Sequence, residues 1–243
     1  MKKQAIIFGL ATISILLSQF LIGCESPTTG ASTSTVQTYT TMSNSRVYSS
    51  SIGTTRDPVI QEGDLCDSIH VSRMRILLSD MKLHHDESDT EGFGTIKTGA
   101  FVLLFTSDSF QFVTGGSIPP TSYDRVKFEI HQYDPLIDLS IDLKAFADFV
   151  TSDRNTVIID GTVYVGGVGY PFTYASRIIV NEQEMFGQSF VTESGKAYAL
   201  TIDYSATTSF KSGSKVLDPR DGTNSHEIDT GIKASLRASM RLN

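Results

Sequence analysis

A strict two-residue alternation of apolar and polar side chains is the feature that most limits how this chain can fold. In YDRVKFEIHQ (residues 123–132), Val126, Phe128 and Ile130 fall on one side and mainly charged residues lie between them. Successive side chains of a β-strand point to opposite faces, so the pattern predicts a strand with one buried face. Residues 197–204 alternate in the same way, and the two segments together favour an all-β fold.

Other segments add strands to this pattern. GAFVLLF (residues 99–105) is a continuous apolar run of a length that suits a strand buried on both faces. Residues 156–165 and 170–179 flank the turn-rich GGVG (166–169), which predicts a hairpin. Over residues 71–84 the apolar phase flips twice, which predicts a bulged or bent strand, with a helix as the alternative.

Connections rich in turn residues separate these strands, and no repeating βα alternation is present. We therefore expect a Greek-key-type antiparallel β-sandwich of about seven or eight strands, with a short C-terminal helix. The helix is expected within residues 225–240, where Ile228, Ile232, Leu236 and Met240 recur every four residues.

The N-terminus has the pattern of an export signal. Lys2 and Lys3 precede an apolar run over residues 5–22, and the run ends in LIGC at Cys24. This leader resembles the lipobox signal of bacterial lipoproteins, in which Leu, a small or apolar residue and Gly or Ala precede the cysteine. The resemblance implies a diacylglyceryl group on the Cys24 thiol and removal of residues 1–23. An ordinary secretory leader with an incidental cysteine is the alternative.

A Ser/Thr-rich tract follows the cysteine. Of the 30 residues from 26 to 55, 17 are Ser or Thr, and such a segment has little apolar surface to bury. We predict a flexible tether over residues 24–60, followed by a β-sandwich domain over 61–243. Short strands at Val36 and Val47 that dock on the domain are one alternative, and an O-glycosylated stalk is another.

The domain itself shows a second resemblance. The segments RILLSDMKLH, KTGAFVLLF, IPPTSYDRVKFEIH, GSKVLDP and IKASL, within about residues 65–240, resemble a domain of unknown function found in bacterial lipoproteins. The resemblance implies a β-sandwich on a surface lipoprotein and assigns no activity to any residue.

Charge limits the partners of the chain. The formal net charge is −7, so the chain lacks the basic footprint of a nucleic-acid-binding protein, and no nucleic-acid partner is expected. The expected partner is membrane lipid, through an anchor on Cys24, while a protein or glycan partner stays open. The lipobox implies a location at the cell membrane or outer membrane, facing the periplasm or the cell surface. By the same family logic, Glu25 in place of Asp favours the outer membrane.

Two acidic loops are the candidate metal sites, since imidazole and carboxylate groups suit zinc and copper, and carboxylates suit calcium. The candidate ligands are His84, His85, Asp86, Asp218, Asp221 and Asp229. Ordinary polar loops are the alternative, because adjacent histidines on a strand point to opposite faces and the later loop lacks the spacing of a calcium-binding EF-hand. A joint site would require both loops to share one end of the sandwich.

Catalytic patterns are weak in this chain. It has no G-x-S-x-G motif and no phosphate-binding P-loop, and Cys66 lies in GDLCD, where carboxylates are expected to raise the thiol pKa. We predict no catalytic residue and no cofactor. A run of aromatic residues is either a sugar-stacking platform or part of the core; its members are Tyr164, Tyr170, Phe172 and Tyr174.

These observations favour a lipid-anchored envelope lipoprotein that carries a non-catalytic binding or structural β-sandwich. A hydrolase of cell wall or polysaccharide and a divalent-cation-binding adhesion module are the two alternatives.

Overall fold

The structure is a computed structural model, and it describes residues 33–49, 66–84, 93–107, 109–136 and 146–243. These described residues form thirteen strands, two α-helices and two short 3-10 helices, which confirms the predicted all-β class. The strands lie in a four-stranded sheet, a seven-stranded sheet and a two-stranded ribbon. The predicted leader and three of the candidate residues, Cys24, His85 and Asp86, lie outside the described residues.

The four-stranded sheet has the order β13-β10-β1-β5. Its strands are β1 (Ser34–Ser43), β5 (Gln111–Ile118), β10 (Ala197–Ser205) and β13 (Leu236–Leu242). β1 runs parallel to β10 and antiparallel to β5, and β10 runs antiparallel to β13. The sheet therefore joins the first and the last strands of the described chain, and one of its pairs is parallel.

β1 corrects the predicted tether, because it lies within residues 24–60 and is hydrogen-bonded on both sides. Val36, Thr38 and Thr40 are buried, while the residues between them face outward. β-branched Thr fits a pleated strand well, and its buried hydroxyl needs only one partner; Thr40, for example, donates to the Leu104 carbonyl. The alternation of buried and exposed residues in β1 could not be recognised as an apolar–polar pattern, because Ser and Thr occupy several of its inward positions.

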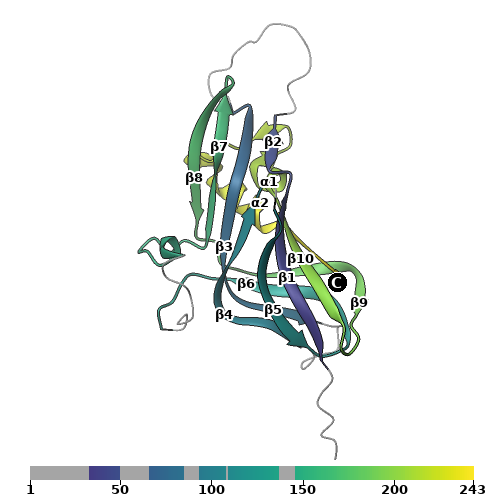
Figure 1. The fold of residues 1–243 in the computed structure, drawn as a ribbon. Coiled ribbons are helices and arrows are strands. Elements are labelled where there is room, and N and C mark those ends of the chain that lie inside the picture. Colours follow the sequence, from purple (N-terminus) through teal and green to yellow (C-terminus); the bar gives the residue numbers. More distant parts are fainter. Residues whose placement is uncertain (1–32, 50–65, 85–92, 108, 137–145) are drawn as a thin grey trace, which may run out of the picture. The chain divides into compact units, whose positions relative to one another are not determined.

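The seven-stranded sheet has the path β8-β7-β3-β6-β9, with β2 and β4 also paired to β3. Its strands are β2 (Arg46–Tyr48), β3 (Ser68–His84), β4 (Phe93–Thr106), β6 (Ser122–Ile130), β7 (Val157–Val165), β8 (Val168–Ser176) and β9 (Val180–Val191). Figure 1 shows β3 as the long central strand, with β7 and β8 beside one end of it and β4 and β6 toward the other.

β3 changes partner along its length. It pairs with β7 over residues 68–76 and with β6 over 78–84, and its register shifts between Val71 and Arg73 and again between Leu78 and Met81. An extra residue in one strand turns the side chains that follow it to the other face of the sheet. Where the apolar pattern of the sequence changes phase, such a bulge brings the apolar side chains back to the core face. The predicted bulged strand is confirmed, and the helical alternative is wrong.

The β7–β8 hairpin also follows the prediction. Its two-residue turn consists of Gly166 and Gly167, whose φ angles are 58° and 79°. A hairpin turn with positive φ at both central residues matches the right-handed twist of its strands, and glycine adopts that conformation without strain.

One hydrophobic core fills the space between the inner faces of the two large sheets. Phe105 of β4 and Tyr204 of β10 meet across it, with ring centroids 5.8 Å apart. A second, smaller cluster lies on the other face of β3 and β4, where Phe149 of η1 (Ala147–Phe149) packs against Leu77 and Val102. This cluster explains why the run at residues 99–105 is apolar on both faces.

The C-terminal helix is present but ends earlier than the spacing predicted. The segment after β10 contains α1 (Ala206–Phe210), β11 (Lys211–Ser212), β12 (Lys215–Val216), η2 (Gly222–Asn224) and α2 (Ser225–Lys233). Ile228 and Ile232 are buried on α2, whereas Leu236 and Met240 lie on β13. A spacing of four residues keeps side chains on one face of a strand as well as of a helix. The pattern therefore did not show where α2 ends and β13 begins.

Candidate functional site

The predicted metal ligand at the end of β3 lies among cations. Burial lowers the pKa of His84, and the nearby charges of Lys127, Arg125 and Lys82 lower it further, while Asp124 offsets part of this. Such surroundings oppose the binding of a cation. Within the part of the chain that the structure describes, no three His, Cys, Asp or Glu side chains form a group that could hold a metal ion.

The aspartates of the second loop are engaged within the protein. Arg220 donates from Nη2 to Oδ2 of Asp218 at 2.7 Å, and Asp221 accepts from the backbone N–H of Thr223 at 2.9 Å as the N-cap of η2. The Tyr174 hydroxyl donates to Oδ1 of Asp229 at 2.7 Å. The contacts of Asp218 and Asp221 are those of a turn and of a cap on η2, whereas Asn224, the N-cap residue of α2, makes no side-chain cap hydrogen bond.

The two predicted loops do not bring His84 and Asp218 together. Asp218 lies near Cys66, two residues before β3, since its carboxylate raises the pKa of that thiol. His84 is the last residue of the same 17-residue strand. At about 3.3 Å per residue, the contour between the two ends of β3 is about 50 Å. A joint site through these two residues is therefore not formed.

Cys66 is not an activated nucleophile. Burial, followed by the Asp218 carboxylate, raises the pKa of its thiol to about 12, and Arg220 offsets only part of this. Because the thiolate is the reactive species, this raised pKa opposes a nucleophilic role for the side chain near neutral pH.

The structure divides the predicted aromatic run into three environments. Phe172 and Tyr174 are buried in the core, so the core interpretation is confirmed for these two residues. Tyr170 is 43% exposed and lies under the Arg220 guanidinium, whose central carbon is 5.1 Å from the ring centroid. Tyr164 lines a pocket on the outer face of the seven-stranded sheet.

This pocket arises from the alternation of three neighbouring strands. Val47 of β2, Ile69 of β3 and Val163 of β7 lie opposite one another and point into the core. The residues on either side of each must therefore point outward. The pocket is lined by Arg46, Tyr48, Ser68, Ile69, His70 and Tyr164, and its volume is about 230 Å³.

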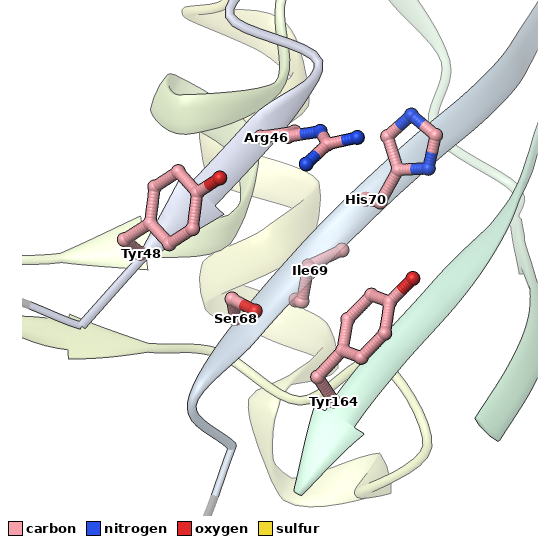
Figure 2. A pocket seen from close by; sticks show the side chains of 6 residues that line it. All are labelled: Arg46, Tyr48, Ser68, Ile69, His70 and Tyr164. Carbon is pink, nitrogen blue, oxygen red and sulfur yellow. The ribbon is translucent and has the colours of Figure 1, made fainter. Parts of the chain in front are cut away.

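Two cross-strand rows make up its outward face. In the first row Ser68 lies between Tyr48 and Tyr164, so a small side chain separates two aromatic rings. Figure 2 shows the two rings on opposite sides of β3. The Tyr164 ring also packs over Gly169, where an added Cβ would lie only 3.2 Å from Cε1 of the ring. This packing restrains the ring from the β8 side.

The second row places Arg46 opposite His70. In Figure 2 the guanidinium extends toward the imidazole, above the floor formed by β3. The six described residues that line the pocket thus combine two phenol rings with a guanidinium, an imidazole and a hydroxyl group.

Sequence reasoning singled out Tyr164 but missed the other lining residues. β2 lies in the segment expected to be a tether, and the pairing of β3 with β2 and β7 joins positions far apart in the chain. One local signal was available, namely that Val47, Ile69 and Val163 are each flanked by polar or aromatic residues.

The fold and this site define a β-sandwich domain with a small, open pocket on the outer face of its larger sheet. Comparison with known proteins found no matching family model, no matching curated protein and no matching solved structure. None of the helices in the described ranges has the length and apolar character needed to cross a membrane.

Proposed function

We propose that this chain is a lipid-anchored lipoprotein of the bacterial envelope whose β-sandwich binds a ligand and catalyses no reaction. The observation that carries the proposal is the LIGC sequence ending at Cys24, after two lysines and an apolar run. A thioether-linked diacylglyceryl group adds two acyl chains, and each buried methylene contributes about 0.8 kcal/mol to membrane binding. Two chains anchor a protein far more stably than one.

The start of β1 limits how far such an anchor could hold the domain from lipid. β1 begins at Ser34, only ten residues after Cys24. Ten residues span at most about 35 Å when fully extended. In this proposal the sandwich therefore works close to the membrane surface, facing the periplasm or the exterior of the cell.

The chemistry of the domain supports binding over catalysis. The Cys66 thiol has a pKa of about 12, and the aspartates at 218, 221 and 229 are held by neighbouring side chains or backbone. The pocket on β2, β3 and β7 instead combines aromatic surface with hydrogen-bonding groups, which is the usual make-up of a recognition site.

Membrane fractionation of the full chain in a bacterial host tests the anchor. Wild-type protein should partition into the membrane fraction and into the detergent phase on phase separation. Cys24→Ala should lose lipid labelling by a radioactive fatty acid and keep the uncleaved leader. Cys66→Ala is the matched control and should behave as the wild type. A Cys24→Ala protein that is still cleaved and still membrane-bound would contradict the proposal.

A further inference from the structure

We infer that the outer edge of β13 binds an extended acidic segment of a partner protein, which adds to the sheet as an antiparallel strand and places its apolar side chains in a groove beside β9. This site is separate from the pocket on β2, β3 and β7. The inference therefore goes beyond the proposed function, and it does not depend on the lipid anchor.

A groove lies between the edge strands of the two large sheets. β13 is at one end of the four-stranded sheet, and β9 is at one end of the path of the seven-stranded sheet. Figure 1 shows the C-terminus beside β9. The groove has a volume of about 340 Å³ and a mainly apolar lining, to which Phe186 and Phe190 of β9 and residues 238–242 of β13 contribute.

A bulge in β9 shapes its side of the groove. Arg125 of β6 pairs with Met185 and Tyr123 pairs with Phe190, so residues 186–189 lie opposite a single residue of β6. Bulges at sheet edges commonly end pairing or redirect side chains. This irregular stretch is unsuited to a ladder with β13, and these two described strands form none.

The hydrogen bonds of β13 show which of its backbone groups face the groove. At one end of the ladder with β10, the Ser205 N–H donates to the Ser235 carbonyl at 3.1 Å. At the other end, the Asn243 N–H donates to the Ala197 carbonyl at 3.0 Å. Hydrogen-bonded pairs alternate along an antiparallel ladder, so the odd-numbered residues of β13 bond to β10 and the even-numbered residues direct their backbone groups to the outer edge.

These outward groups define a site five residues long. The carbonyl of Leu236 already accepts from Nη1 of Arg237 at 2.5 Å. Ala238, Met240 and Leu242 follow, and all three line the groove. An added strand can bond both the N–H and the C=O of each of them, over a length of about 17 Å.

The two faces of β13 select the side chains of the added strand. Residues opposite Met240 and Leu242 point into the groove, and apolar side chains there would bury Leu242, which is 60% exposed. Residues opposite Arg237 and Arg241 point to the other face, where carboxylates pair favourably with the arginines. We expect the larger effect at Arg241, because Arg237 also lies 3.7 Å from Oε1 of Glu184.

The same charges disfavour a second copy of this chain as the added strand. In an antiparallel pair of β13 strands centred on Ser239, Arg237 of each copy would lie directly opposite Arg241 of the other. In a pair centred on Met240, the two copies of Arg241 would be diagonal neighbours. Like charges that face each other across a strand pair are destabilising.

Fluorescence anisotropy with labelled, end-capped peptides and the full chain in a non-ionic detergent tests the inference. The peptide VEVTVE places valines opposite Ala238, Met240 and Leu242 and glutamates opposite the two arginines. It should bind at least about tenfold more tightly than VKVTVK or than VEVTVE with N-methylvaline at its third residue. Equal binding of VKVTVK would overturn the role of charge, equal binding of the N-methylated peptide would overturn strand addition, and no binding of any peptide would overturn the site.

A reversal of charge tests the register. Wild-type protein should prefer VEVTVE to VKVTVE, whereas Arg241→Glu should prefer VKVTVE, because the second residue of the peptide lies opposite position 241. A loss of stability alone would not reverse this order. Arg177→Glu, at a side chain that is 64% exposed, is the matched control and should keep the wild-type order. An unchanged order in Arg241→Glu would overturn the inference.

Amide hydrogen exchange tests whether the edge is open. The amides of Ala238 and Met240 should exchange quickly in the free chain and slowly with saturating VEVTVE, while that of Ser239, which faces β10, should be protected in both. Protection of Ala238 and Met240 in the free chain would overturn the inference, and light scattering would then distinguish a dimer from a segment of the same chain. Membrane fractionation of the same samples keeps the lipid anchor a separate question.

Discussion

Arg75 donates from Nη1 to Oδ2 of Asp148 at 2.7 Å, although the arginine side chain is only 8% exposed and the aspartate is 48% exposed. The same guanidinium has its Nη2 3.6 Å from Oδ2 of Asp160, and its central carbon lies 5.8 Å from the centroid of the Phe149 ring. The contact attaches η1 to β3 on the outer face of the large sheet. It thereby holds Phe149 over the second hydrophobic cluster.

We predict that this ion pair stabilises the domain modestly and in a pH-dependent manner. The hydrogen bond from Arg75 lowers the pKa of Asp148 below its ordinary value near 4. A lowered folded-state pKa gives stabilisation that is present above the ordinary pKa and is lost as the pH falls through the folded value. Asp148→Asn should lower the free energy of unfolding by up to about 1 kcal/mol at pH 7, since the carboxylate is half exposed.

Urea unfolding between pH 2 and pH 7 measures this effect. The difference between the wild type and Asp148→Asn should shrink as the pH falls below 4. Asp153→Asn is the control, because Asp153 pairs with Arg177 at 3.9 Å with both side chains well exposed. A difference that stays constant over the whole pH range would show that the ionised carboxylate is not the cause.

Phe149→Ala should cost much more than the loss of the ion pair. The ring is fully buried against Leu77, Val102 and Ile158. Truncation of a buried Phe usually costs about 3–5 kcal/mol, because a cavity is left. Chemical denaturation should show this loss, and hydrogen exchange should show weaker protection around η1. Leu136→Ala, at a side chain that is 85% exposed, should be nearly neutral. A loss below about 1 kcal/mol would mean that the cluster contributes little.

A pair of substitutions on β1 distinguishes a strand from a tether. Val36 is fully buried, and its neighbour Thr35 is exposed. Val36→Asp should destabilise the domain by more than about 4 kcal/mol, since it buries an unpaired charge. Thr35→Asp should change stability by less than about 0.5 kcal/mol. Thermal unfolding followed by circular dichroism measures both, and equal tolerance of the two substitutions would favour the tether.

Gly231→Ala should destabilise the protein even though alanine favours helices. A Cβ at this position on α2 would lie 2.7 Å from the Thr208 carbonyl oxygen and 2.8 Å from Cα of Ser209. These are backbone atoms of α1, so the clash outweighs the gain of about 1 kcal/mol in helix propensity. We expect a lower midpoint of urea unfolding. Gly222→Ala, which meets no atom within 4 Å, is the control, and a stabilised Gly231→Ala protein would contradict the close packing of the two helices.

Cys66 should react slowly in the folded protein. The chain has two cysteines, so Cys24→Ser leaves Cys66 as the sole thiol. A pKa raised from 9.0 to about 12 reduces the thiolate at pH 8 about a thousandfold, and the greater nucleophilicity of a more basic thiolate restores part of this. Alkylation by iodoacetamide should be at least about 50-fold slower than in urea-unfolded protein.

The substitution Asp218→Asn tests whether the Asp218 carboxylate contributes to the slow reaction of the Cys66 thiol. The Asp218 carboxylate raises the pKa of Cys66 and Arg220 lowers it, so removal of the carboxylate should accelerate alkylation. Similar rates in folded and unfolded wild-type protein would contradict both the burial and the electrostatic account.

Several elements were predictable because their signals are local. The alternation over residues 123–132 predicted β6, and Gly166 and Gly167 of GGVG predicted the β7–β8 turn. The phase flips of residues 71–84 even predicted the bulges of β3, since each flip must be absorbed within the same strand. The main prediction for the region of β1 was a tether, with a short strand at Val36 only as the alternative, because the inward positions of β1 include Thr38 and Thr40, whose burial depends on partners elsewhere in the chain.

The sequence by itself determined the all-β class, the main strands and the position of the predicted lipid attachment at Cys24, since these follow from residue order alone. Only the tertiary structure decided that His84 and Asp218 lie at opposite ends of β3 and that Tyr48 and Tyr164 flank Ser68. The physical reason is that strand pairing is non-local. A period of two tells which face a side chain occupies, but not which strand will lie beside it.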